Sequence, residues 1–310
     1  MSELIDVLGK IQDTVSAIER TERAIINYPD TASLRINLQS LQERQKALED
    51  AFSIISSKER LDICTYRLFT EQDQQIAVKS LSKTLLDFQN LFSVVYDAIK
   101  HDRPKERGYV GSESINATTF NFAYTVPGSV GVVLTMPNER LLSGDTLLDQ
   151  TMKTVFEMAN VATSEEVRVF ADMLGVAPIW KMYEWAVDQS NAGLGSEIQW
   201  SRENKVKARL FKQKPEFEAL GNTIQSTSKE SEEIVNVIGQ LKGADVTNHT
   251  FHLEFGKKHI KGKMSESIGI RDTVELPKPY KATIKIITTV NYATGKVYEE
   301  HFLLSLASVE

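Results

Sequence analysis

Two mirrored apolar series dominate the first 57 residues. In both, apolar side chains recur at alternating steps of four and three with one interruption, which is the heptad spacing of a coiled-coil seam. Pro29 lies between the series and stops the first helix, so that Ile25 falls opposite Leu34. The spacing therefore predicts an antiparallel helical hairpin over residues 1–57. The two series are Leu4, Leu8, Ile11, Val15, Ile18 and Ile25, and then Leu34, Leu38, Leu41, Leu48, Phe52 and Ile55.

The apolar stripe widens at the end of the hairpin away from the turn. Ile5, Val7, Ala51 and Ile54 add apolar surface there that two helices cannot bury between themselves. This end must pack on the body of the same chain or on another copy, and we hypothesise a homo-oligomer held through the helices. The alternative is a pair of amphipathic helices lying flat on the body. The residues assigned to oligomerisation are Leu4, Leu8, Ile11, Val15, Ile18, Leu38, Leu41, Leu48, Phe52 and Ile55.

Residues 58–195 predict a small α+β domain. A run rich in β-formers at 61–69 precedes helical spacing from Thr70 to His101. Two further β-rich runs flank Pro127-Gly128-Ser129, which is typical of a β-hairpin. Helical patterns then occupy residues 145–160, 164–174 and 178–190.

Residues 196–228 predict a basic connector, because breaker-rich and Ser/Glu-rich stretches surround a strongly cationic segment. Six basic residues stand against two acidic ones between Glu197 and Lys214. Trp200 and Phe211 flank the cations, and single-stranded nucleic acid binds such mixtures of cations and aromatic rings. The candidate residues for nucleic-acid binding here are Arg202, Lys205, Lys207 and Arg209.

A strand offers one arrangement for this segment. If Val206, Ala208 and Leu210 point inward, the cations at 205, 207 and 209 share the outward face. A solvated, lysine-rich edge that prevents the strand from pairing with another chain is the competing interpretation.

From residue 229 to 310 the apolar period changes to two. Five short runs separated by Gly-containing or Pro-containing turns predict a small antiparallel β-barrel of SH3-like or OB-like size. A hairpin of this barrel forms a second basic segment and supplies further candidates for nucleic-acid binding, namely Lys257, Lys258, Lys261 and Lys263. The expected fold class is thus a multidomain α+β chain with a helical hairpin, a central α+β domain and a terminal barrel.

The sequence contains no motif that names a reaction. Phosphate-cradling loops, the HExxH zinc motif, the GxSxG elbow and the kinase motifs do not occur in it. Cys64 is the one cysteine, which excludes an intramolecular disulfide and a cysteine-based metal site. His249 and His252 are three residues apart and would face opposite sides of a continuous strand. We predict no catalytic residue, no cofactor and no metal.

A divergent metal-dependent nuclease is the enzymatic alternative. Glu203 and Lys205 have the spacing of an acidic ligand and a water-positioning lysine, and Asp188 lies fifteen residues before Glu203. The nuclease pattern is incomplete, because Asp188 falls near the end of a predicted helix.

The net charge of −6 is unevenly distributed along the chain. Residues 1–195 carry 19 basic and 27 acidic side chains, whereas residues 196–310 carry 17 and 15. The start of the chain resembles no secretory signal and no stretch is apolar enough to span a membrane, so we expect a cytoplasmic protein without a membrane partner. We predict a non-enzymatic interaction or assembly protein that pairs with itself and with a protein partner. Nucleic-acid binding by the basic connector and barrel is the alternative function.

Overall fold

The structure, a computed structural model, describes residues 2–70, 75–126, 130–139, 144–245, 247–265, 268 and 276–309. The chain divides into two units, Met1–Ser226 and Thr227–Glu310, and each is described by itself. The expected fold class is confirmed: the chain has an N-terminal helix pair, an α+β sheet domain and a closed five-stranded barrel.

The first unit holds all the helices of the described residues and one sheet. Its elements are α1 (Ser2–Asn27), α2 (Ala32–Lys58), β1 (Leu61–Thr70), α3 (Val78–His101), α4 (Ser112–Thr118), β2 (Asn121–Val126), β3 (Val130–Pro137), α5 (Leu147–Ala159), α6 (Ser164–Leu174), α7 (Val176–Asn191), β4 (Leu194–Arg202), β5 (Lys205–Lys212) and α8 (Lys214–Gln225).

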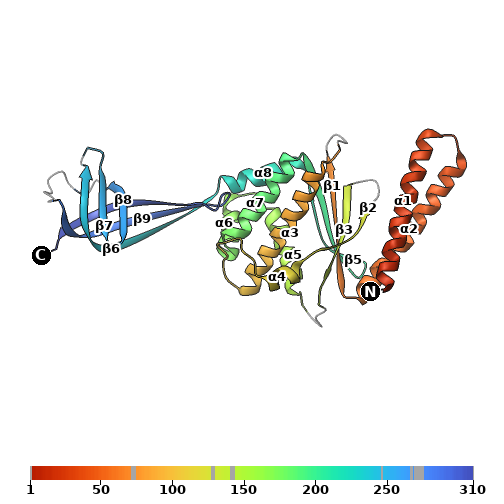
Figure 1. Ribbon diagram of the computed structural model, residues 1–310, viewed down its shortest axis with the longest axis horizontal. Coiled ribbons are helices and arrows are strands. Elements are labelled where there is room, and N and C mark those ends of the chain that lie inside the picture. Colours follow the sequence, from red (N-terminus) through yellow and green to blue (C-terminus); the bar gives the residue numbers. More distant parts are fainter. Residues whose placement is uncertain are drawn as a thin grey trace. The chain divides into compact units, whose positions relative to one another are not determined.

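The predicted hairpin is formed by α1 and α2, which pack side by side on either side of a short turn (Figure 1). Ile11 and Ile18 are buried in the seam between them. Thr21 is buried there as well, while Glu22 is exposed, so the seam passes one residue earlier than the heptad series predicts. A helix repeats every 3.6 residues, so that a straight pair drifts away from a strict seven-residue pattern.

The wide apolar end of the hairpin packs on the sheet of the same chain. Val7 and Phe52 share a buried cluster with Tyr124 of β2 and Val133 of β3. The rings of Phe52 and Tyr124 meet edge to face, with centroids 5.3 Å apart. Of the two partners that the sequence left open for this end, the structure places the body of the same chain against it.

The sheet has the strand order β2-β3-β1-β4-β5, with antiparallel pairing throughout the described strands. Helices α3 to α8 gather on one of its faces, and the α1–α2 hairpin packs on the β2–β3 part of the other (Figure 1). Tyr66 of β1 points to that face and packs against Phe88 of α3, and Phe88 in turn lies against Trp185 of α7. Burying each of these large side chains contributes about 1.5–3 kcal/mol. The core of this unit therefore lies between the sheet and the helices.

The structure differs from the expected connector over residues 196–228. This stretch forms most of β4, then β5 and α8, and it belongs to the first unit. Trp200 and Leu210 are each 1% exposed on the helix-covered face, and Phe217 of α8 packs against Trp185. The cations of this stretch alternate with apolar residues at period two, and the apolar members hold it in the core.

Of two further local predictions, one is wrong and one lies outside the described residues. Thr70, expected to begin a helix, ends β1, and α3 begins at Val78. The alternation of β-formers continues through Thr70 and keeps it in the sheet. The predicted turn at Pro127-Gly128-Ser129 lies outside the described residues, although β2 and β3 do pair as a hairpin would.

The second unit is the barrel, with the strand order β10-β8-β7-β6-β9. Leu253, Ile284 and Leu303 belong to its core. A parallel contact between β8 and β10 completes the ring. Gly262 permits this approach, because a Cβ there would lie 2.1 Å from the carbonyl oxygen of His301. The strands are β6 (Ser228–Asp245), β7 (Thr250–Phe255), β8 (Lys258–Met264), β9 (Lys278–Asn291) and β10 (Val297–Ser308).

Candidate functional site

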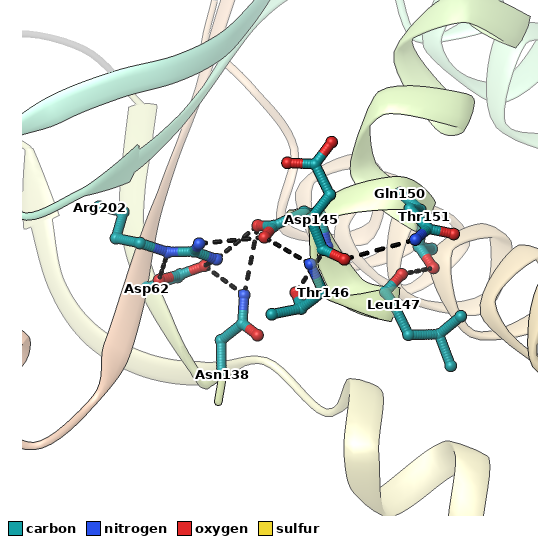
Figure 2. Close-up of polar contacts among 9 residues, drawn as sticks. Asp62, Asn138, Asp145, Thr146, Leu147, Gln150, Thr151 and Arg202 are labelled. Atoms are coloured by element: carbon teal, nitrogen blue, oxygen red, sulfur yellow. Dashed lines mark hydrogen bonds and ion pairs between the residues drawn. The ribbon is translucent and has the colours of Figure 1, made fainter. Parts of the chain in front are cut away.

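A buried ion cluster lies at one end of the sheet of the first unit (Figure 2). Asp62 of β1 is fully buried, and Arg202 ends β4 on the neighbouring strand. The Nε atom of Arg202 donates to Asp62 Oδ1 at 2.8 Å, and its Nη2 atom donates to Asp62 Oδ2 at 2.7 Å. This is the two-point geometry that makes a guanidinium–carboxylate pair strong and directional.

The other edge of the same guanidinium holds Asp149, in the first turn of α5. Nη1 of Arg202 donates to Asp149 Oδ2 at 3.0 Å, and Nη2 also bonds this carboxylate. Asp149 closes a capping box with Thr146, and Asn138 donates to Asp62 Oδ2 at 2.7 Å. The cluster thus ties β1, β4, the segment after β3 and the start of α5 together.

The chemistry of this cluster is structural. Burial alone would raise the pKa of Asp149, but the hydrogen bonds from Arg202 and Thr146 outweigh it and hold the pKa below its ordinary value. The hydrogen bond to Asp62 raises the pKa of Arg202 further. A carboxylate held ionised by a permanent cation is a poor proton carrier, so we interpret the cluster as a lock rather than an acid–base pair.

Arg202 is therefore removed from the predicted nucleic-acid-binding set. Its side chain is 11% exposed and its guanidinium is engaged by two carboxylates. A cleft of about 490 Å³ borders the cluster, lined among others by Arg60, Tyr96 and Glu139.

The residues of the nuclease alternative do not come together. Asp188 lies near the end of α7, just before β4 begins, whereas Glu203 and Lys205 lie beyond the other end of β4. A strand of nine residues is roughly 30 Å long at about 3.3 Å per residue. Within the described ranges, no group of three or more His, Cys, Asp or Glu side chains could hold a metal.

Asp188 instead lies close to Asp87 of α3. Lys83 bridges the two, with its Nζ atom 2.7 Å from Asp188 Oδ2 and 3.4 Å from Asp87 Oδ2. Burial and the neighbouring Asp188 raise the pKa of Asp87 to about 6. This is a helix–helix contact whose charge changes near neutral pH.

The sheet face opposite α3–α8 forms the candidate binding surface over β1, β4 and β5, while the α1–α2 hairpin packs on the β2–β3 part of the same face. Cross-strand register places Arg67 of β1, Glu197 of β4 and Phe211 of β5 in one row, and Thr65, Gln199 and Arg209 in the next. None of these side chains is buried. We call this surface the open sheet face and define it as Thr65, Arg67, Phe69, Glu197, Gln199, Val206, Lys207, Arg209 and Phe211.

An aromatic pair lies on the open sheet face. The rings of Phe69 and Phe211 are stacked, with centroids 5.2 Å apart and planes inclined by 15°. Phe69 reaches Phe211 across Gly195 of β4, where a Cβ would lie 2.2 Å from the Phe69 ring. Phe211 is 50% exposed, so that one side of the stack is open to a further ring.

The charges on the open sheet face are mainly positive. Arg67, Lys207 and Arg209 are exposed, and Glu197 is the one carboxylate in the set just defined. Glu197 forms an ion pair with Arg209 at 2.5 Å, which leaves two positive charges in excess.

The predicted alternation along β5 is broken by a bulge. The register shifts between Trp200 and Ser201, so that Val206 lies opposite Ser201 and Lys205 lies opposite Arg202. Val206, expected inside, is 55% exposed on the open sheet face. Lys205 is thereby directed to the other face, and Lys207 and Arg209 remain together.

The basic residues of the barrel lie in the second unit. Lys257 and Lys258 are at the turn between β7 and β8, while Lys261 and Lys263 are on β8, with all four exposed. They stay separate candidates, and none belongs to the open sheet face.

The ten predicted oligomerisation residues lie along the hairpin of the same chain. Ile11, Val15 and Ile18 are buried in the unit, and Phe52 and Ile55 are buried against the sheet. Leu4, Leu8, Leu38, Leu41 and Leu48 are half-buried.

Sequence reasoning missed Phe69, Arg67 and Gly195. A signal for the first two was present, because alternation in the run at 61–69 puts its odd-numbered residues on one face. Gly195 gave no such signal, since the need for a bare Cα arises only when Phe69 crosses it.

Comparison with known proteins gives no match: no family model fits the chain, and neither a curated protein nor a solved structure resembles it. Among the helices of the described residues, none combines the length and apolar character needed to cross a membrane.

Proposed function

We propose that this protein binds single-stranded nucleic acid on the open sheet face, without catalysing a reaction. The observation that carries the proposal is the half-exposed Phe69–Phe211 stack, placed beside three exposed cations on a rigid sheet. We place this activity in the cytoplasm, a location that a single cysteine in the sequence supports.

The chemistry of the ligand follows from the two kinds of side chain. Arg67, Lys207 and Arg209 supply positive charge for phosphates, and Phe211 supplies a ring on which a base can stack. Bases in a duplex are already stacked and cannot reach the ring, so the surface favours an unpaired strand. Gln199 adds an amide that can donate to and accept from base edges.

The salt dependence of binding measures the electrostatic part of this proposal. With three phosphates neutralised, the logarithm of the association constant should fall against the logarithm of salt concentration with a slope of about −2. Fluorescence anisotropy of a labelled oligonucleotide, measured across a salt series, gives this slope.

Charge reversal on the face tests which cations are responsible. We expect Lys207→Glu with Arg209→Glu to weaken binding strongly and to flatten the salt slope. Lys153→Glu with Arg168→Glu is the matched control, because both residues are exposed on α5 and α6, which lie on the other side of the sheet (Figure 1). Equal loss in both double variants would refute the assignment to this face.

A second candidate is the predicted assembly role, with a second copy of the chain as partner. The observation that favours it is the exposure of Ile26, Tyr28 and Ile36 at the turn end of the hairpin, at 78%, 66% and 70%. Deleting residues 1–57 would also strip Phe52 from the sheet, so replacing these three residues by serine is the sharper test. Light scattering should then show a fall to the monomer mass, and an unchanged mass would reject assembly through the tip.

A further inference from the structure

A groove of about 720 Å³ lies on the barrel, across β6, β7 and β8. Two cross-strand rows line it: Gly243, His252 and Lys261 form the first, and Asp245, Thr250 and Lys263 form the second. On the same strands Phe251, Leu253 and Ile260 point into the core. The side chains of the two rows therefore project outward, away from the core.

The two lysines of the groove carry charge that no side chain of the described residues neutralises. Lys261 and Lys263 are exposed, and neither forms an ion pair within the part of the chain that the structure describes. They are two residues apart on β8, which is about 6.6 Å along a strand. Long, flexible stems allow both ammonium groups to reach one ligand between them.

Asp245, the acidic residue that lines the groove, is hydrogen-bonded within the turn that follows it. The carboxylate of Asp245 accepts hydrogen bonds from the backbone of Thr247 at 2.9 Å and of Asn248 at 3.0 Å, and from Asn248 Nδ2 at 2.7 Å. These hydrogen bonds satisfy Asp245 without either lysine. In the groove the lysines neighbour Thr250 and His252, and Lys263 Nζ also lies 5.9 Å from the centroid of the Phe302 ring.

The glycine in the first row leaves room for a ligand. A Cβ built at Gly243 would have one neighbouring atom within 4 Å, the His252 Cβ at 3.9 Å. A side chain at position 243 would therefore project into open space beside His252 and Lys261 instead of clashing with the barrel.

We propose that this groove binds a phosphate or diphosphate group, held by Lys261 and Lys263 with Thr250 and His252 as its polar walls. Two ammonium groups that form no ion pair with the described residues favour a ligand with more than one negative charge, and lysine binds phosphate as a compact point charge. The site is in the second unit and does not depend on the open sheet face, so either proposal can fail alone.

The test uses the full-length protein with ¹³C-labelled histidine rings, titrated with inorganic phosphate and with pyrophosphate at constant ionic strength. The ring resonance of His252 should shift and reach saturation, with a higher affinity for pyrophosphate than for phosphate. The ring resonance of His101, in the first unit, should not shift. Lys261→Glu with Lys263→Glu should lower the affinity at least about tenfold. Lys281→Glu with Lys296→Glu, two exposed positions of the same unit outside the groove, should leave it unchanged.

A second variant tests the groove in case the double charge reversal unfolds the barrel. Gly243→Val adds bulk without changing charge and should also abolish the His252 shift, while the remaining histidine resonances keep their positions. The proposal is overturned if His252 shows no saturable shift in the wild type. It is also overturned if the control pair loses affinity as the groove pair does.

The source of the phosphate is distinguished by a third titration, in the Lys207→Glu, Arg209→Glu background. If a polynucleotide backbone is the ligand, a short unpaired oligonucleotide should shift His252 and displace pyrophosphate even in this background. If the site takes free phosphate compounds, the oligonucleotide should leave the pyrophosphate-bound resonance in place.

Discussion

The ring of Phe211 on β5 stacks on the ring of Phe69 on β1, with Gly195 of the intervening strand beneath them. Two strands that do not pair with each other thus place their aromatic side chains in contact on the open sheet face. The contact requires a bare Cα on β4, because a Cβ at position 195 would lie 2.2 Å from the Phe69 ring. A residue without a side chain therefore determines the shape of the proposed binding surface.

Gly195→Ala should displace Phe69 and separate the two rings. We expect weaker binding of unpaired oligonucleotides, together with a loss of stability of about 1–3 kcal/mol from the overpacked contact. Anisotropy titration and chemical denaturation measure the two effects. Gly9→Ala, at an exposed position of α1 where nothing lies within 4 Å of the added Cβ, is the control and should preserve binding. Unchanged binding in Gly195→Ala would show that the stack is not used.

Arg202→Ala should be among the most destabilising single changes in the first unit. It leaves Asp62 and Asp149 without their cation, and breaking a buried pair in this way costs about 3–5 kcal/mol. Arg209→Ala is the matched control, since Arg209 is 60% exposed and its pair with Glu197 should contribute less than about 1 kcal/mol. Urea denaturation of both variants gives the comparison, and similar losses would contradict the account of the cluster.

The Asp87–Asp188 contact predicts a stability gain from removing a charge. The pKa of Asp87 is raised from its ordinary value of 3.8 to about 6. Protonated Asp87 therefore contributes its full stabilisation of the folded state below pH 3.8, and this contribution is lost as the pH rises through 6. Asp87→Asn imitates the protonated form and should stabilise the protein by about 1–3 kcal/mol at pH 8. The difference from wild type should vanish near pH 4.

Asp97→Asn is the control of opposite sign for that experiment. Burial alone would raise the pKa of Asp97, but hydrogen bonds from Lys105 and Ser114 lower it, so its contribution is present at neutral pH and is lost on acidification. This variant should therefore be destabilised at pH 8 and approach wild type in acid. Thermal melts at a series of pH values would contradict both assignments if the two variants behaved alike.

The regular patterns of the sequence predicted the architecture well. The mirrored heptads of residues 1–57 and the period-two runs after residue 229 each describe interactions between neighbours in sequence, and both elements are found. The prediction of a connector was wrong because it rested on the charges of residues 202–214. Leu210 and Phe217 anchor that stretch in the core. Arg202 illustrates the same limit, since its partners Asp62 and Asp149 are 140 and 53 residues away.

The sequence predicted the part of the open sheet face that β5 supplies, but not the part that β1 supplies. Lys207, Arg209 and Phe211 are close in sequence and their shared face follows from strand alternation, apart from the bulge at Val206. Phe69 and Arg67 come from a strand more than 130 residues earlier, and only the register of β1 with β4 brings them to the same surface. Strand order is a tertiary property, which local periodicity does not contain.

The most direct test of the central claim compares the removal of two equally exposed phenyl rings from opposite faces of one sheet. Phe211 is 50% exposed on the open sheet face, and Phe122 is 58% exposed on the other face, opposite Leu134 of β3. Stacking of one base on an aromatic ring is worth about 1–3 kcal/mol. Oligonucleotide affinity, measured by anisotropy at fixed salt, should fall by roughly 5-fold to 150-fold in Phe211→Ala and stay unchanged in Phe122→Ala. Equal affinities in the two variants, or no binding by the wild-type protein at low salt, would contradict the account.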